Sequence, residues 1–280
     1  MYKGFYINLD RSADRRARME QQLRRTGRAE IYARSAAIDA EQQDIPDVGG
    51  LKKGEVACFL SHFQTIEAAR ACGQHLHIAE DDAIFPDDIV ERIEMIVASD
   101  AFEQYDLFFT ETIIPLSADY LQEYQRIYKE NTHAKGAIDF SAVEAKGMYR
   151  ASASSYVVNR NSADRLARLV EAELAEGPRY PFDIFLRTLI DSDRLRAAII
   201  VPFLTAVAPD DAVQSTIGDR SQEKDSIMAM TLLRTLFYKD CDAGSLLATI
   251  KKTLTSDDGD REQAIAQLMK FGVFGNYKAF

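Results

Sequence analysis

Short apolar runs alternate with longer amphipathic stretches from Tyr2 to Val201. The runs are rich in aromatic and β-branched residues and end at polar residues, which is typical of buried strands. They cover residues 2–9, 30–38, 76–79, 105–110, 156–159 and 197–201. Strands that alternate with helices along a chain usually form a parallel sheet with helices on its faces. The pattern therefore predicts an α/β fold with a mainly parallel sheet.

The clearest helix is predicted over residues 54–72, where apolar residues recur at spacings of three and four and Gly73 ends the pattern. A surface helix is expected between Ser12 and Gly27, and a third helix is expected to begin at Pro86. A fourth follows residues 156–159, with Asn161 or Ser162 as its N-cap. The segment 115–150 is polar and irregular, which predicts a loop or an insertion over the site.

The length, net charge and cysteine content limit the possible domain size, partners and cellular compartment. With 280 residues, 46% of them hydrophobic, the chain can bury the core of one large α/β domain with or without an appendage. A net charge of −10 argues against a nucleic-acid partner, which requires a basic surface, but leaves an anionic small substrate open. The three cysteines form no CxxC pair, and we find no signal peptide and no apolar stretch of roughly 20 residues. We expect a cytoplasmic protein, with contact to a membrane surface left open.

Three adjacent carboxylates, Glu80, Asp81 and Asp82, follow the strand at residues 76–79. Their mutual repulsion is tolerable if they are solvated or share a cation. Their hard oxygen atoms suit Mg²⁺ or Mn²⁺, and open α/β sheets bind ligands at strand ends. The alternative is an acidic turn that caps the next helix.

The first strand ends at Asn8-Leu9-Asp10 and leads into a helix that begins with several arginines. Backbone amides and guanidinium groups at this point could hold a nucleotide. The alternative is a solvated basic helix surface. The chain has neither a GxGxxG motif nor a P-loop, so it gives no support for a dinucleotide fold or a P-loop kinase.

Other titratable residues have structural explanations. Ser61 and His62 are adjacent on a helix and cannot form a dyad, so His62 is expected to be a half-buried structural histidine. His75 and His77 lie on one face of a strand but lack a spaced third ligand for zinc. Asp183, next to an aromatic residue, could serve as a general base or cap the helix at 184–190.

The order of the motifs resembles glycosyltransferase family 25, the bacterial lipooligosaccharide galactosyltransferases and their relatives. The matching stretches are Tyr6-Ile7-Asn8-Leu9-Asp10-Arg11 with Asp14-Arg15-Arg16, Gly54-Glu55-Val56-Ala57-Cys58-Phe59-Leu60-Ser61-His62, Ile78-Ala79-Glu80-Asp81-Asp82-Ala83, Ser155-Tyr156-Val157-Val158-Asn159, Pro181-Phe182-Asp183, and Pro209 with Gln214 and Ser215. The resemblance covers residues 1–220, which we take as the catalytic domain.

This resemblance implies a GT-A fold, a UDP-sugar donor, a divalent metal (Mn²⁺ or Mg²⁺) and inversion at the anomeric carbon. It implies that Asp82 binds the metal together with Asp81 or Glu80. It also implies a donor site formed by Ile7, Asn8, Leu9, Arg15, Ser61, Glu80, Asp81 and Gln214. An inverting transfer needs a base for the acceptor hydroxyl. Asp183 is the first candidate and Glu111 the second.

The predicted function is transfer of a hexose, namely galactose, from a UDP-sugar to an oligosaccharide or glycolipid acceptor of the bacterial surface (LPS or LOS). Alternatives are another UDP-sugar, a protein acceptor, a metal-dependent phosphohydrolase, or a non-catalytic nucleotide-sugar-binding protein. The tail, residues 221–280, is predicted to be a helical extension. Its helices could pack on the catalytic domain, form a homodimer contact, or lie on the inner membrane as a peripheral anchor.

Overall fold

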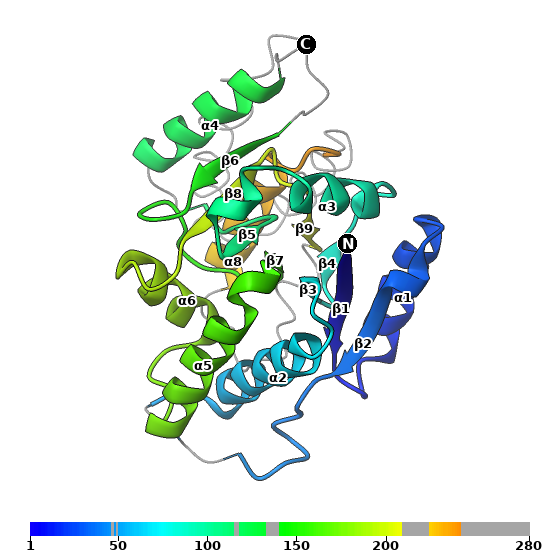
Figure 1. Ribbon diagram of the computed structural model, residues 1–280, viewed down its shortest axis with the longest axis vertical. Coiled ribbons are helices and arrows are strands. Elements are labelled where there is room, and N and C mark those ends of the chain that lie inside the picture. Colours follow the sequence, from blue (N-terminus) through cyan, green and yellow to red (C-terminus); the bar gives the residue numbers. More distant parts are fainter. Residues whose placement is uncertain (46–47, 49, 115–117, 133–139, 209–223, 242–280) are drawn as a thin grey trace.

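The computed structural model describes residues 1–45, 48, 50–114, 118–132, 140–208 and 224–241. Its central sheet has seven strands in the order β2-β1-β3-β7-β5-β8-β6 (Figure 1). Strands β2, β1, β3, β5 and β8 run in one direction, and β7 and β6 run in the other. The strands are β1 (Tyr2–Asn8), β2 (Tyr32–Ala36), β3 (His75–Glu80), β5 (Leu107–Phe109), β6 (Ser141–Glu144), β7 (Ser155–Val158) and β8 (Ala197–Val201). Two short strands, β4 (Ala83–Ile84) and β9 (Ala206–Val207), form a separate antiparallel pair.

Helices cover both faces of this sheet (Figure 1). One core layer contains side chains of α1 and α3, and the other contains side chains of α2, α4, α5, α6 and α8. The bounds are α1 (Ala13–Arg25), α2 (Lys53–Arg70), α3 (Ile89–Val97), α4 (Ala118–Thr132), α5 (Arg160–Glu176), α6 (Phe182–Asp191) and α8 (Lys224–Thr235), with 3-10 turns η1 (Ala29–Ile31) and η2 (Phe102–Gln104). The predicted α/β class with a Rossmann-like sheet is confirmed, and it is consistent with GT-A.

The apolar runs of the sequence are explained by burial of the sheet on both faces. In β1, Phe5 and Ile7 belong to one core layer and Tyr6 belongs to the other. In β8, Ile199 and Ile200 are divided between the layers in the same way. Because successive side chains of a strand point to opposite faces, a strand covered on both faces needs apolar residues at almost every position.

His75 and His77 of β3 are buried next to polar partners. His77 lies between the Tyr32 hydroxyl, 2.6 Å from Nδ1, and the Ser155 hydroxyl, 2.9 Å from Nε2. Burial lowers the pKa of His77 to about 3 and that of His75 to about 4. The imidazole of His77 is therefore neutral at physiological pH and links β2, β3 and β7.

Several sequence predictions need correction. The segment 115–150 contains α4 and β6 rather than irregular structure alone, and the buried Tyr124 and Ile127 of α4, three residues apart, account for that helix. The strand predicted over 30–38 begins only at Tyr32, because η1 precedes it. The N-cap of α5 is Asn159, whose side chain accepts a hydrogen bond from the Asn161 backbone. Asn159 takes this role because β7 ends at the residue before it.

The topology brings several chain segments to one edge of the sheet. The carboxyl ends of the parallel strands β1, β3, β5 and β8 lie at this edge, and so does the amino end of the antiparallel β7. Such an edge is where open α/β sheets bind ligands. No helix among the described residues is long and apolar enough to cross a membrane.

Candidate active site

A cavity of about 520 Å³ opens at this edge of the sheet. Its walls come from the end of β1, the first turns of α2, the acidic end of β3, the segment before β7, the start of α6, and α8. These segments are far apart in the sequence. The fold therefore creates the cavity and gathers polar side chains in it.

The acidic triplet lies in this cavity, and neighbouring residues hold it in place. Asp81 accepts a 2.6 Å hydrogen bond from the Asn8 side chain. Arg15 lies 3.3 Å from Asp81 Oδ1 and 3.9 Å from Asp82 Oδ2. Asn8 is 1% exposed and is not among the described residues that line the cavity. It therefore orients Asp81 from the protein interior. Asn8 and Arg15, two of the predicted donor-site residues, thus contact the triplet itself.

Burial and repulsion make the triplet costly to ionise fully. Burial, together with the charges of Glu80 and Asp81, raises the pKa of Asp82 to about 8. Burial also raises the pKa of Asp81, although the hydrogen bonds from Asn8 and Arg15 oppose this. Asp82 Oδ1 is buried without a hydrogen-bond partner among the described residues. A buried carboxylate oxygen with no donor is the arrangement that a bound cation would satisfy.

Glu80 has a different environment, in which His62 stabilises its charge. The imidazole Nε2 of His62 lies 3.1 Å from Glu80 Oε1, and Nδ1 lies 3.0 Å from the Tyr156 hydroxyl. Burial opposes ionisation of Glu80, but the His62 hydrogen bond and the nearby arginines outweigh it and lower its pKa. Because an ionised carboxylate can only accept, Nε2 of His62 donates to Glu80. His62 is 1% exposed, so the prediction of a half-buried histidine was wrong.

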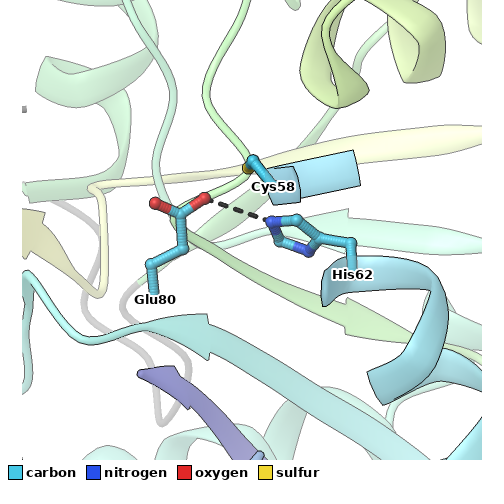
Figure 2. A group of neighbouring side chains, drawn as sticks. All are labelled: Cys58, His62 and Glu80. Carbon is cyan, nitrogen blue, oxygen red and sulfur yellow. Dashed lines mark hydrogen bonds and ion pairs between the residues drawn. The ribbon is translucent and has the colours of Figure 1, made fainter. Parts of the chain in front are cut away.

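Figure 2 shows His62 facing the Glu80 carboxylate, with Cys58 close to both. Cys58 and His62 are one helical turn apart on α2, and their ligand atoms and a Glu80 oxygen lie within 4.8 Å of one another. A thiol, an imidazole and a carboxylate are ligands that suit Zn²⁺. The oxygen atoms of Asp81 and Asp82 suit Mg²⁺ or Mn²⁺ instead.

Another part of the cavity wall, next to the triplet, is a mixed apolar and polar surface. Ile7 and Leu9 line it at the end of β1, and the segment after β2 lines it from Ala37 to Glu41. The Ser61 hydroxyl accepts a 2.9 Å hydrogen bond from the Ile38 backbone and donates to the Ala57 carbonyl. Ser61 thus ties α2 to the segment after β2 and shapes this part of the cavity.

Asp183, the first predicted base, lies in the cavity wall at the start of α6. Its Oδ2 accepts from the Ser152 backbone at 3.0 Å, and its Oδ1 accepts from the Ile184 backbone at 2.8 Å. Ser152 has a backbone φ of 89°, which residues other than glycine rarely adopt. Asp183 and Glu111 both bond to Ser152 and hold it in this strained conformation.

Glu111, the second predicted base, follows β5 and is fully buried. The hydroxyls of Ser152 and Ser154 donate to Oε1, and Arg234 of α8 lies 3.1 Å from Oε2. Both oxygens therefore have partners. Glu111 is not among the described residues that line the cavity, in contrast to Asp183.

Sequence reasoning missed several residues of this site. Cys58, Ser152, Ser154 and Arg234 line the cavity but were not predicted as site residues. Cys58 lies in the same matching stretch as His62. His62 could have been found through its place in the Leu-Ser-His stretch. Gln214, which the resemblance assigns to the donor site, falls outside the described residues.

Comparison with known proteins identifies the family of the chain. The model of glycosyltransferase family 25 (LPS biosynthesis protein) matches residues 1–186, which is more than half of the chain. This range includes Asn8, Arg15, the acidic triplet and Asp183. A search of curated proteins gives no match.

Proposed function

Because the chain belongs to glycosyltransferase family 25, we propose that it moves a hexose, galactose, from a UDP-sugar to a saccharide acceptor with inversion of the anomeric carbon. The family description names LPS biosynthesis, so the proposed acceptor is an oligosaccharide or glycolipid of the bacterial surface. This reaction requires a site for a nucleotide, a site for a diphosphate and a base for the acceptor hydroxyl. The cavity offers residues for each. We propose a cytoplasmic location for the enzyme, with peripheral contact to the inner membrane as an open alternative.

The observation that carries the proposal is the acidic triplet with its unpartnered Asp82 oxygen. Asp82 and Asp81 would hold a divalent metal, Mn²⁺ or Mg²⁺, next to the donor. When bound, the metal supplies positive charge that neutralises the departing diphosphate. Arg15 keeps the two aspartates in place through its ion pairs, and Asn8 fixes the orientation of Asp81. Glu80, whose pKa is lowered by its hydrogen bond to His62, would also border the donor.

The nucleotide would occupy the part of the cavity formed by β1 and the segment after β2. Ile7 and Leu9 give the uracil ring an apolar surface, and backbone groups near Ile38 are positioned by Ser61. The absence of a GxGxxG motif or a P-loop from the sequence fits a nucleotide site built this way.

Asp183 is the proposed base. Two backbone N–H groups orient its carboxylate, and it lines the cavity. It would take the proton of the acceptor hydroxyl while that oxygen bonds to the anomeric carbon. The bond from that carbon to the UDP oxygen breaks, and its electron pair leaves with UDP. Glu111 is less suited to this role because Arg234 and two serine hydroxyls already engage it.

The test is calorimetric titration of UDP, GDP, CDP and uridine into the purified protein, with MnCl₂ or with EDTA. Binding that is selective for UDP and dependent on Mn²⁺ is expected, with a matching rise of the melting temperature. UDP-galactose and UDP-glucose are then compared in the same titration. Their rates of UDP release with a lipooligosaccharide-derived acceptor identify the donor. If no nucleoside diphosphate binds with or without metal, the proposed donor is wrong. Release of phosphate from simple esters would indicate a phosphohydrolase instead.

A further inference from the structure

Helix α8 forms one wall of the cavity although it lies beyond the segment that matches the family. Met230, Thr231 and Arg234 of this helix line the cavity. Leu232 and Leu233, between them, are buried in the main core. Helix α8 is therefore packed on the sheet with one face directed at the site. It follows both the family match, which ends at residue 186, and the catalytic domain expected from the sequence.

Arg234 is the charged side chain on this face, and it is 7% exposed. Its Nη1 donates to Glu111 Oε2 at 3.1 Å and to the Ser152 hydroxyl at 3.4 Å. Its Nε is buried with no hydrogen-bond partner among the described residues. Burying a guanidinium is unfavourable unless its N–H groups are satisfied, so a guanidinium that lines the cavity and is not fully hydrogen-bonded is suited to bind an oxyanion.

The charged groups around Arg234 favour one kind of oxyanion. Its positive charge acts on both Glu80 and Asp82, as does the charge of Arg15. Arg15 and Arg234 come from opposite parts of the chain and are both in the cavity wall. Two arginines beside carboxylates that suit a divalent metal form a typical site for a phosphate group, since guanidinium groups bind phosphate oxygens through two hydrogen bonds.

We propose that Arg234, held in place by Glu111, binds the terminal phosphate of the nucleoside diphosphate donor. This inference rests on the proposed function. Glu111 is a positioning residue: its buried carboxylate fixes the guanidinium, and Ser152 and Ser154 fix the carboxylate. Arg234 stabilises the negative charge that the diphosphate gains when the bond to the sugar breaks. Helix α8 thus belongs to the catalytic unit.

A purely structural role would make the Arg234–Glu111 pair a link between α8 and β5, with no effect on ligand affinity. The single variant Arg234→Met leaves Glu111 buried without a counter-charge and can fail to fold. The double variant Glu111→Gln/Arg234→Met removes both charges, and the glutamine can still accept from the serine hydroxyls. Circular dichroism and thermal melting confirm that it folds.

The matched control is Arg165→Met. Arg165 forms an ion pair with Asp106, a carboxylate that is 10% exposed. Asp106 directly precedes β5, whereas Glu111 follows this strand at its other end. The control therefore carries the same substitution, next to a mostly buried carboxylate, away from the cavity.

The experiment is calorimetric titration of UDP and uridine in MnCl₂ into the wild type, the double variant and the control. We expect the double variant to bind UDP about 10- to 100-fold more weakly, because a hydrogen bond to a charged group is lost. Uridine, which lacks phosphate, should bind all three proteins equally. UDP affinity in the folded double variant within about twofold of wild type would overturn the role of Arg234 while leaving the proposed donor intact. Failure of wild type to bind UDP would overturn the donor assignment and this inference with it.

Discussion

Replacing Asp82 with asparagine should stabilise the metal-free protein and remove its response to metal. The pKa of Asp82 is raised from 3.8 to about 8. Between these values the folded protein keeps a proton that the unfolded chain has lost. The free energy of unfolding of the wild type therefore falls as pH rises from about 4 to about 8. Asparagine carries no charge at any pH in this window, so the variant escapes this penalty.

The magnitude follows from the shift. Each pKa unit corresponds to about 1.4 kcal/mol, so the limiting penalty at pH 8 is on the order of 5 kcal/mol. Solvent reorganisation around a cavity wall reduces such penalties, and we expect about 1 to 3 kcal/mol. For a domain of this size the melting temperature changes by roughly 2 to 4 °C for each kcal/mol. The melting temperature of the variant should thus be several degrees above that of wild type at pH 8 and nearly equal to it near pH 4.

The assay is thermal melting of both proteins from pH 4 to pH 8, in EDTA and again in MnCl₂. Metal should raise the melting temperature of wild type but not of Asp82→Asn, since the substitution removes a ligand. Asp87→Asn is the control, because Asp87 is 71% exposed and pairs only with Arg25 among the described residues. A variant less stable than wild type in EDTA at pH 8 would refute the reasoning about burial. Equal stabilisation of both proteins by Mn²⁺ would refute the metal assignment.

Three further outcomes are expected. Asp183→Asn should lower the rate of UDP release in the presence of an acceptor by about 10²- to 10⁴-fold, which is the usual effect of losing a general base. UDP affinity should stay unchanged, and a weaker affinity would contradict this role. The pKa of His77 is lowered to about 3, so below pH 6.5 the unfolded chain binds a proton that the folded protein does not. In chemical denaturation the free energy of unfolding of the wild type should fall by about 2 kcal/mol between pH 6.5 and pH 5, and that of His77→Gln should fall less. Gly4→Ala should destabilise the protein by about 1 to 3 kcal/mol in the same assay, because the added Cβ would lie 2.3 Å from the Tyr32 ring.

The sequence predicted those parts of the fold that depend on local pattern. The helix over 54–72 was recognised because apolar residues at spacings of three and four identify one buried face. The strands were recognised because burial on both faces requires continuous apolar runs. The boundaries of β2 and α5 were missed by a few residues, since a 3-10 turn and a cap depend on hydrogen bonds that a local pattern does not specify.

The acidic triplet and its place at a strand end also follow from the sequence alone. The partners that give it chemical character do not. Asn8 and Asp81 are 73 residues apart, and Glu111 and Arg234 are 123 residues apart. Such pairs meet only because parallel strands place their carboxyl ends at one edge of the sheet and α8 returns to cover that edge.

Tertiary structure alone therefore decided the protonation of the site. The same aspartate has an ordinary pKa in the unfolded chain and one near 8 in the folded protein, because burial and the fields of distant residues add together there. It also distinguished Asp183, whose carboxylate lines the cavity, from Glu111, whose carboxylate is engaged by Arg234. Sequence specifies which groups are present, whereas the fold sets their distances and their solvation, on which the chemistry of these groups depends.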